Sequence, residues 1–129
     1  MIFDTTFLID LQRELRRGEE SGRAGTFLAN LEGETFRVAF VTRMEFAEGF
    51  APDRREECEL FLASFGTLYA DEETCWQAGQ ISRSLRETGE AIGDHDVWIA
   101  ALGLQHGEAV VTRNEKHLVR VEGLEVQGY

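Results

Sequence analysis

Cysteine is scarce in this chain of 129 residues, which contains only Cys58 and Cys75. Their spacing does not suit a metal site and nothing indicates secretion, so we expect reduced thiols in the core or near the surface. The start Met1-Ile2-Phe3-Asp4 lacks the basic segment and apolar core of a signal peptide. No apolar run approaches the roughly 20 residues that a bilayer span needs. These absences predict a cytoplasmic protein without a membrane segment.

Basic residues are also few: 13 Lys and Arg face 24 Asp and Glu, a formal net charge of −11. This surplus argues against a protein that coats nucleic acid by bulk attraction. It does not exclude a nuclease, because bound cations can neutralise several carboxylates. RNA contacts would then come from local arginines, and the candidates are Arg13, Arg16 and Arg17, which share a helix face, together with Arg83 and Arg113. The alternative is that these arginines form solvated helix faces.

Strand and helix patterns alternate along the chain, and the 43% hydrophobic content suffices for the core of one domain over residues 1–129. Strands are expected at 1–3, 37–41, 67–70, 109–111 and 124–127. Helices are expected at 7–17, 26–31, 43–48, from Pro52 through Phe65, from Asp71 to Gly89, from Gly93 to the stop at Gly107, and at 115–118. Thr42 is expected to be the N-cap of the third helix, and Cys75, Ala78, Ile81 and Leu85 are expected to face inward from the fifth. This alternation predicts an α/β fold whose mainly parallel sheet is covered on both faces.

Carboxylates stand at the ends of several of these elements. Asp4 follows the first strand, Glu45 is expected in the first turn of the helix after the second, and Asp96 lies in the first turn of its own helix. Thr112-Arg113-Asn114 follows the strand at 109–111. Because ligands of open α/β sheets bind outside the carboxyl ends of the strands, these side chains should meet at one edge.

Acids gathered at one edge repel each other unless cations bind there. Mg²⁺ or Mn²⁺ would suit the site, since these ions take oxygen ligands and retain several waters. Two such ions roughly 3.5 to 4 Å apart can activate a water and stabilise the leaving oxygen of a phosphodiester. The expected chemistry is therefore metal-assisted hydrolysis.

Each polar residue could also have a purely structural role. Asp4 could cap the following helix, while Asp96 and Asp94 could each serve as a partner of a helix dipole. Asn114 could be a turn or cap residue. Glu45 could be a residue of a helix surface. Glu48 is expected on the surface, and His95 is expected to be exposed and not to bind a metal.

Four segments carry a resemblance to a known family. They are Asp4-Thr5-Thr6, Glu45-Phe46-Ala47-Glu48-Gly49, Asp96-Val97-Trp98-Ile99-Ala100-Ala101 and Val111-Thr112-Arg113-Asn114-Glu115-Lys116-His117-Leu118. In this order they resemble the motifs of PIN-domain ribonucleases, above all the VapC-type toxins of bacterial toxin–antitoxin modules. Val121-Glu122-Gly123-Leu124-Glu125-Val126 resembles the closing segment of the family.

The resemblance implies a PIN-like three-layer α/β/α sandwich and an Mg²⁺-dependent endoribonuclease acting on structured RNA such as tRNA or rRNA. It makes Asp4, Glu45 and Asp96 the metal-binding acids and gives the fourth catalytic position to Asn114, where many members carry Asp. Asp94 is either a supplementary ligand or incidental. The resemblance also implies a homodimer silenced by a VapB-type antitoxin, which would insert an arginine toward the carboxylates.

Other classes fit the same residues less well. A haloacid dehalogenase-like phosphatase needs a second Asp two residues after Asp4, where Thr6 stands, and a response-regulator receiver finds only a poor match in Ala70-Asp71. The remaining alternative is a catalytically weak PIN-fold module that binds RNA or protein. Asn114 keeps that alternative open, whereas the three acids favour activity.

Overall fold

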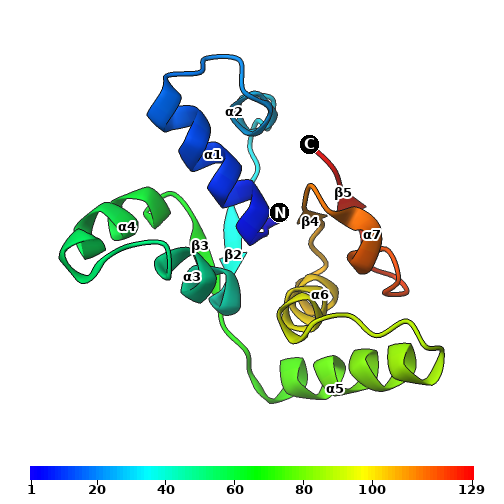
Figure 1. Cartoon of the computed structure of the whole chain (residues 1–129). Coiled ribbons are helices and arrows are strands. Elements are labelled where there is room, and N and C mark those ends of the chain that lie inside the picture. The colour runs from blue at the N-terminus through cyan, green and yellow to red at the C-terminus, as the bar shows by residue number, and fades with distance from the viewer.

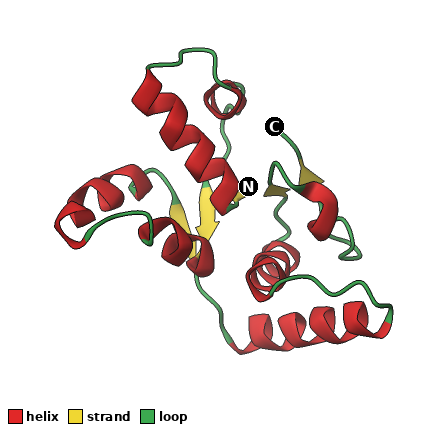
Figure 2. Ribbon diagram, in the orientation of Figure 1, coloured by secondary structure: helices red, strands yellow, loops and turns green.

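A five-stranded parallel sheet organises the computed structural model, which describes residues 1–129 (Figures 1 and 2). Its strand order is β3-β2-β1-β4-β5. The strands are β1 (Ile2–Phe3), β2 (Arg37–Ala39), β3 (Gly66–Leu68), β4 (Val110–Val111) and β5 (Val126–Gln127). The helices are α1 (Thr5–Arg17), α2 (Arg23–Ala29), α3 (Phe40–Ala47), α4 (Arg55–Leu62), α5 (Glu72–Glu87), α6 (Asp94–His106) and α7 (Glu115–Leu118), with a 3₁₀ turn η1 (Pro52–Arg54). Because every pairing is parallel, all strands point their carboxyl ends to one edge.

Alternating side chains of the central strands divide the core between the two faces of the sheet. Ile2 and Val110 belong to one buried cluster, whereas their neighbours Phe3 and Val111 belong to another. Successive side chains of a strand point to opposite faces, so each short strand contributes to both clusters. The fold is therefore the predicted α/β arrangement, with helices on both faces of a parallel sheet.

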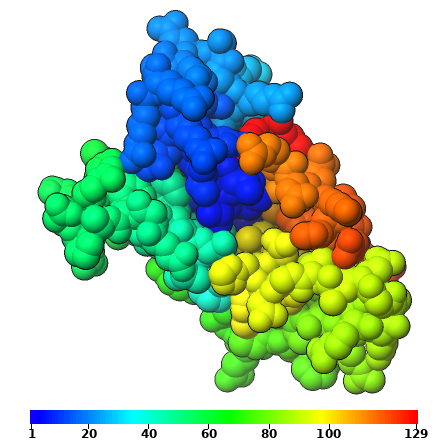
Figure 3. All heavy atoms as spheres, viewed as in Figure 1, coloured from blue at the N-terminus to red at the C-terminus, as the bar shows by residue number.

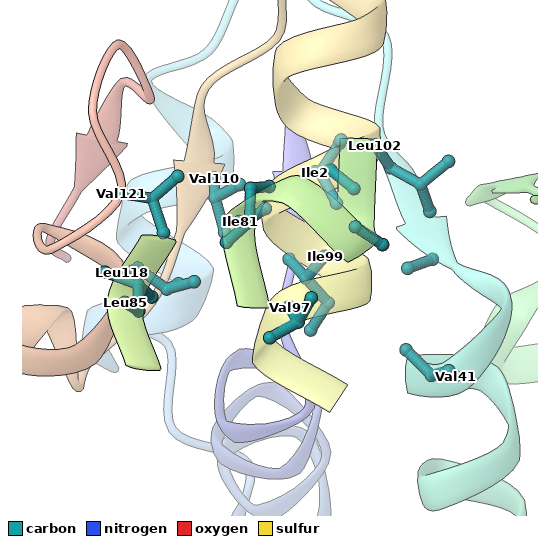
Figure 4. Close-up of a cluster of buried hydrophobic side chains, with 14 residues drawn as sticks. Ile2, Val41, Ile81, Leu85, Val97, Ile99, Leu102, Val110, Leu118 and Val121 are labelled. Carbon is teal, nitrogen blue, oxygen red and sulfur yellow. The ribbon is translucent and has the colours of Figure 1, made fainter. Parts of the chain in front are cut away.

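The first cluster lies between the sheet and the pair α5 and α6 (Figure 4). Its buried side chains include Ile2, Val110, Ile81, Leu85, Val97, Ile99, Leu102, Leu118 and Val121.

At the start of α5, Asp71 Oδ1 accepts the Thr74 backbone N–H at 2.8 Å, and Gln105 Nε2 of α6 donates to Asp71 at 3.0 Å. The hydrogen bonds from Thr74 and Gln105 lower the pKa of Asp71 to about 2.

The second cluster is aromatic and lies under α1, α2 and α4. The rings of Phe3 and Phe7 have centroids 4.5 Å apart, and Tyr129 meets Phe7 edge-on at 4.8 Å. The Tyr129 hydroxyl also donates to Asp10 Oδ2 at 2.9 Å. The final residue is thereby packed against α1, close to the carboxyl edge of the sheet.

Several predicted boundaries are wrong. The helix expected at 26–31 is α2, which begins at Arg23, and the strand expected at 37–41 ends at Ala39. Thr42 does not cap a helix, because α3 starts at Phe40 and buries Thr42 completely, leaving its hydroxyl without a partner. The helix expected through Phe65 ends at Leu62.

The thiols take opposite positions, since Cys58 is buried and Cys75 is exposed, and both are free. Cys75 was expected on the inner stripe of its helix, but Thr74 takes the inward position instead. The reason is the capping box at the start of α5, in which Thr74 and Asp71 bond reciprocally. No helix combines the length and apolarity needed to cross a bilayer.

Candidate active site at the carboxyl edge of the sheet

Asp4 lies between β1 and α1 and is only 8% exposed. Its Oδ1 accepts the Phe7 backbone N–H at 3.0 Å and the Thr6 hydroxyl at 2.7 Å, and its Oδ2 accepts the Thr112 hydroxyl. Burial raises the pKa of Asp4, these hydrogen bonds oppose the shift, and the negative charge of Asp96 adds to it. Asp4 does cap α1, as one of the two sequence interpretations predicted. Its hydrogen bonds do not fully offset the free-energy cost of burying the ionised carboxylate, and a bound cation would lower that cost.

Glu45 reaches the same edge from α3. The prediction that it lies in the first turn is wrong, because α3 begins at Phe40 and Glu45 occupies the second turn. Glu45 Oε1 accepts the Thr5 hydroxyl at 3.0 Å and lies 3.2 Å from Nδ1 of His95. Since Thr5 follows Asp4 in the chain, Glu45 is brought next to the first acid.

Asp96 is the third residue of α6, as predicted, and is held by a residue of α7. Its Oδ2 lies 3.3 Å from Nδ1 of His117. His95, which precedes Asp96, contacts Glu45, so one chain of neighbours joins the three predicted acids. No three Asp, Glu, His or Cys side chains lie close enough together to hold a metal ion as they stand.

The weaker candidates differ in their connection to these acids. Asn114 is the N-cap of α7, and its backbone N–H donates to the Thr112 hydroxyl oxygen at 3.0 Å. Its exposed side chain makes no capping bond and is free to meet a ligand. Asp94 is exposed at the start of α6 without a hydrogen bond or ion pair, and Glu48 is exposed at the end of α3. Of these three, only Asn114 is connected to a partner of Asp4.

Sequence reasoning did not find the side chains that bond to the acids. These are Thr5, Thr6, Thr112, His95 and His117. Thr5 and Thr6 directly follow Asp4, and this adjacency was the one available signal. His95 and His117 gain their partners only when α3, α6 and α7 are packed together.

The predicted RNA-binding arginines do not form one group. Arg13, Arg17 and Arg113 line a common hollow beside α1. Arg16 instead faces α4, where it lies 3.4 Å from Glu57. Arg83 lies on α5, across the sheet, and pairs with Glu87 at 3.1 Å. The structure therefore divides the Arg13, Arg16 and Arg17 triplet between two neighbouring surfaces.

Comparison with known proteins gives a family match over most of the chain. The family model described as PIN domain matches residues 1–124. A protein of Methanocaldococcus jannaschii called Ribonuclease VapC1 is 28% identical over 123 residues, covering 95% of this chain and 81% of that protein. Ribonuclease VapC1 of Haemophilus influenzae strain R2866 is also 28% identical, over 104 residues, covering 77% of this chain and 78% of that protein.

Solved structures give the same answer for the fold. A chain of VapBC-1 from nontypeable Haemophilus influenzae superposes with a TM-score of 0.78 at 25% identity, covering 99% of this chain and 98% of that one. A chain of VapBC2 from Rickettsia felis, bound to a DNA fragment from their promoter, gives a TM-score of 0.82 at 18% identity, with 100% and 99% coverage. At 18% identity the second likeness concerns the fold alone.

Proposed function

The chain belongs to the PIN-domain family, and on that basis we propose that it is a metal-dependent endoribonuclease, the toxin of a toxin–antitoxin module. Its substrate would be a structured RNA such as tRNA or rRNA. The observation that carries the proposal is the position of Asp4, Glu45 and Asp96 along the carboxyl edge of the sheet, where Thr5 and His95 link them. The relatives called Ribonuclease VapC1 and the structural neighbours in VapBC complexes support it.

The same acids would hold Mg²⁺, with Mn²⁺ as the alternative ion and Asp94 as a supplementary ligand. All these donors are carboxylate oxygens, which Mg²⁺ prefers. Asp4 accepts three hydrogen bonds, and a carboxylate offers roughly four lone-pair sites, so it keeps one for a cation. When bound, the metal would supply an activated water and stabilise the leaving oxygen of the phosphodiester.

The protein's own contribution would be to orient these carboxylates. Asp4 is fixed by the Thr6 and Thr112 hydroxyls and the Phe7 N–H, Glu45 by the Thr5 hydroxyl and His95, and Asp96 by His117. Supporting contacts of this kind hold ligands within the narrow range of geometry that catalysis requires. The exposed amide of Asn114 would orient a water or a phosphate at the same edge.

We further propose two protein partners. A VapB-type antitoxin with a basic segment would suit a chain whose net charge is −11, and an inserted arginine would relieve the uncompensated acids. A second copy of the chain would form the homodimer. Tyr69 and Trp76, on either side of the start of α5, are 69% and 66% exposed, and large exposed aromatic groups are frequent at such interfaces. Light scattering of the wild-type protein and of Trp76→Ser would test the dimer.

Cleavage of RNA by the purified, antitoxin-free protein tests the activity. Total tRNA and rRNA are incubated with the protein in EDTA, Mg²⁺ or Mn²⁺. Cleavage should require the metal and disappear in Glu45→Gln and Asp96→Asn. Glu48→Gln, which makes the same change in charge on the same helix as Glu45→Gln, should cleave like the wild type. RNA binding without any metal-dependent cleavage would support the alternative of a catalytically weak binding module.

A further inference from the structure

We propose that a hollow beside α1 binds phosphates of the RNA strand next to the cleaved bond. This arginine hollow is lined by Arg13 and Arg17 of α1, Arg23 at the start of α2, and Arg113 in the loop after β4. Its volume is about 410 Å³. The inference rests on the proposed ribonuclease function and specifies where the substrate backbone is held.

One residue that lines the arginine hollow, Arg113, is next in sequence to a residue of the acidic site. Arg113 follows Thr112, whose hydroxyl donates to Asp4. Since an α-helix rises 1.5 Å per residue, Arg13 and Arg17 lie about 14 and 20 Å along α1 from Asp4. Figure 3 shows α1 (blue) meeting the segment after β4 (orange) on one face of the molecule. An RNA strand lying across the acids would therefore reach these guanidinium groups if it continued along α1.

Two of the three acidic residues that line the arginine hollow, Glu14 and Asp10, already accept hydrogen bonds, and the third, Glu19, pairs with Arg17. Both carboxylate oxygens of Glu14 accept backbone N–H groups of α2, from Ala24 at 2.9 Å and Gly25 at 2.8 Å. Asp10 accepts the Tyr129 hydroxyl at 2.9 Å and one nitrogen of Arg113 at 2.8 Å. These acids consequently have little capacity left to occupy the remaining arginines.

The remaining arginines are held loosely. The Arg13 side chain is 62% exposed and lies 3.9 Å from Asp10, at the limit of an ion pair. The Arg17 side chain is 69% exposed and lies 3.5 Å from Glu19, and Arg23 has no ion pair. Exposed pairs of this kind contribute little, so a phosphate can displace them at low cost. In a chain of net charge −11, this is a local concentration of available guanidinium donors.

The chemistry of the lining favours a polyanion over a protein helix. None of the residues that line the arginine hollow is hydrophobic. The hollow between α1 and α4 differs, because Leu15, Phe50 and Phe61 line it and would suit an apolar partner. Guanidinium groups bind phosphates through paired N–H donors, which matches what the arginine hollow offers.

Salt-dependent RNA binding tests the proposal. The triple variant Arg13→Gln, Arg17→Gln and Arg23→Gln is compared with a control of equal charge change, Arg54→Gln, Arg55→Gln and Arg86→Gln, none of which lines the arginine hollow. Fluorescein-labelled total tRNA is titrated in Ca²⁺, in place of Mg²⁺, over a series of salt concentrations. Each lost phosphate contact flattens the plot of log K against log salt by about 0.7 to 1, so three contacts should flatten it by about 2 to 3. The control should keep the wild-type slope.

An unchanged slope in the triple variant, or equal flattening in the control, would overturn the proposal. So would a triple variant that binds RNA normally but escapes its antitoxin, since the arginine hollow would then hold the protein partner. Melting curves with and without Mg²⁺ check that the triple variant is folded and that its acids still respond to metal. Failure of the proposed function would show separately, as a lack of cleavage by the wild type in Mg²⁺.

Discussion

Replacing Gly22 by alanine is expected to destabilise the protein through a side chain that belongs to another helix. Gly22 precedes α2, whose first turn is capped by Glu14 of α1. A Cβ at Gly22 would lie 2.1 Å from Cδ and 2.3 Å from Oε2 of Glu14. The alanine therefore expels the carboxylate from the N–H groups of Ala24 and Gly25.

The size of the effect follows from the bonds lost. Removing an N-cap side chain costs roughly 0.5–2 kcal/mol, and a hydrogen bond to a charged group contributes about 1.5–3 kcal/mol. The Glu14 bonds are only partly buried and water can replace them, so we expect a loss of about 1–2 kcal/mol. At roughly 4 °C per kcal/mol for a domain of this size, the melting temperature should fall by about 4–8 °C.

A double-mutant cycle identifies the cause. Urea and thermal unfolding are measured for the wild type, Gly22→Ala, Glu14→Ala and the double variant. In the Glu14→Ala background the alanine at position 22 should cost almost nothing, which gives an interaction energy of about 1–2 kcal/mol. Gly25→Ala serves as the control, because its Cβ would stay 3.4 Å from Glu14. An equal cost of Gly22→Ala in both backgrounds would refute the role given to Glu14.

Three further outcomes are expected. Asp4→Asn should abolish cleavage and, in EDTA, should raise the free energy of unfolding at neutral pH, because burial raises the pKa of Asp4 in the folded protein. This gain in stability should vanish as the pH falls below the ordinary carboxyl range, which urea unfolding at several pH values would show. The pKa shift of Asp71 has the opposite sign: hydrogen bonds lower its pKa to about 2, so the ionised side chain stabilises the fold above the ordinary value of 3.8, and this contribution is lost as the pH falls through 2. Asp71→Asn should therefore remove that part of the fall in melting temperature at acid pH. Asn114→Ala should lower the initial cleavage rate severalfold while Glu48→Ala leaves it unchanged, and the reverse order would transfer the fourth site position to Glu48.

The sequence predicted the arrangement of elements because short buried strands and amphipathic helices have distinct periods. Once the sheet was expected to be parallel, Asp4 and the segment after β4 had to share an edge. Gly107 was correctly predicted as a helix stop and adopts positive φ at the C-cap of α6, as Gly18 does at the C-cap of α1. These features depend on local chemistry, which a single sequence displays.

The wrong predictions concern helix starts and side-chain directions that depend on packing between elements. Thr42 has the side chain of an N-cap, but α3 follows β2 without a loop, so its first turn falls on Phe40 and the cap is Ala39. The turn assigned to Glu45 was wrong for the same reason. The arginine triplet was treated as one face, whereas α4 places Glu57 beside Arg16 and so separates it from the hollow that Arg13 and Arg17 line. No pattern within α1 contains that information.

The central position of β1 has a consequence for the order in which the protein is made. The bond from Thr112 to Asp4 joins residues 108 positions apart, and β1 pairs with β4 over a similar interval. Asp4 is synthesised first among the acids, yet its partner Thr112 and the histidine that holds Asp96 come from the last part of the chain. Contacts of such long range form only after the intervening chain has emerged from the ribosome and folded. While this protein is being translated, its candidate site therefore stays incomplete until the segment with Thr112 and His117 has emerged.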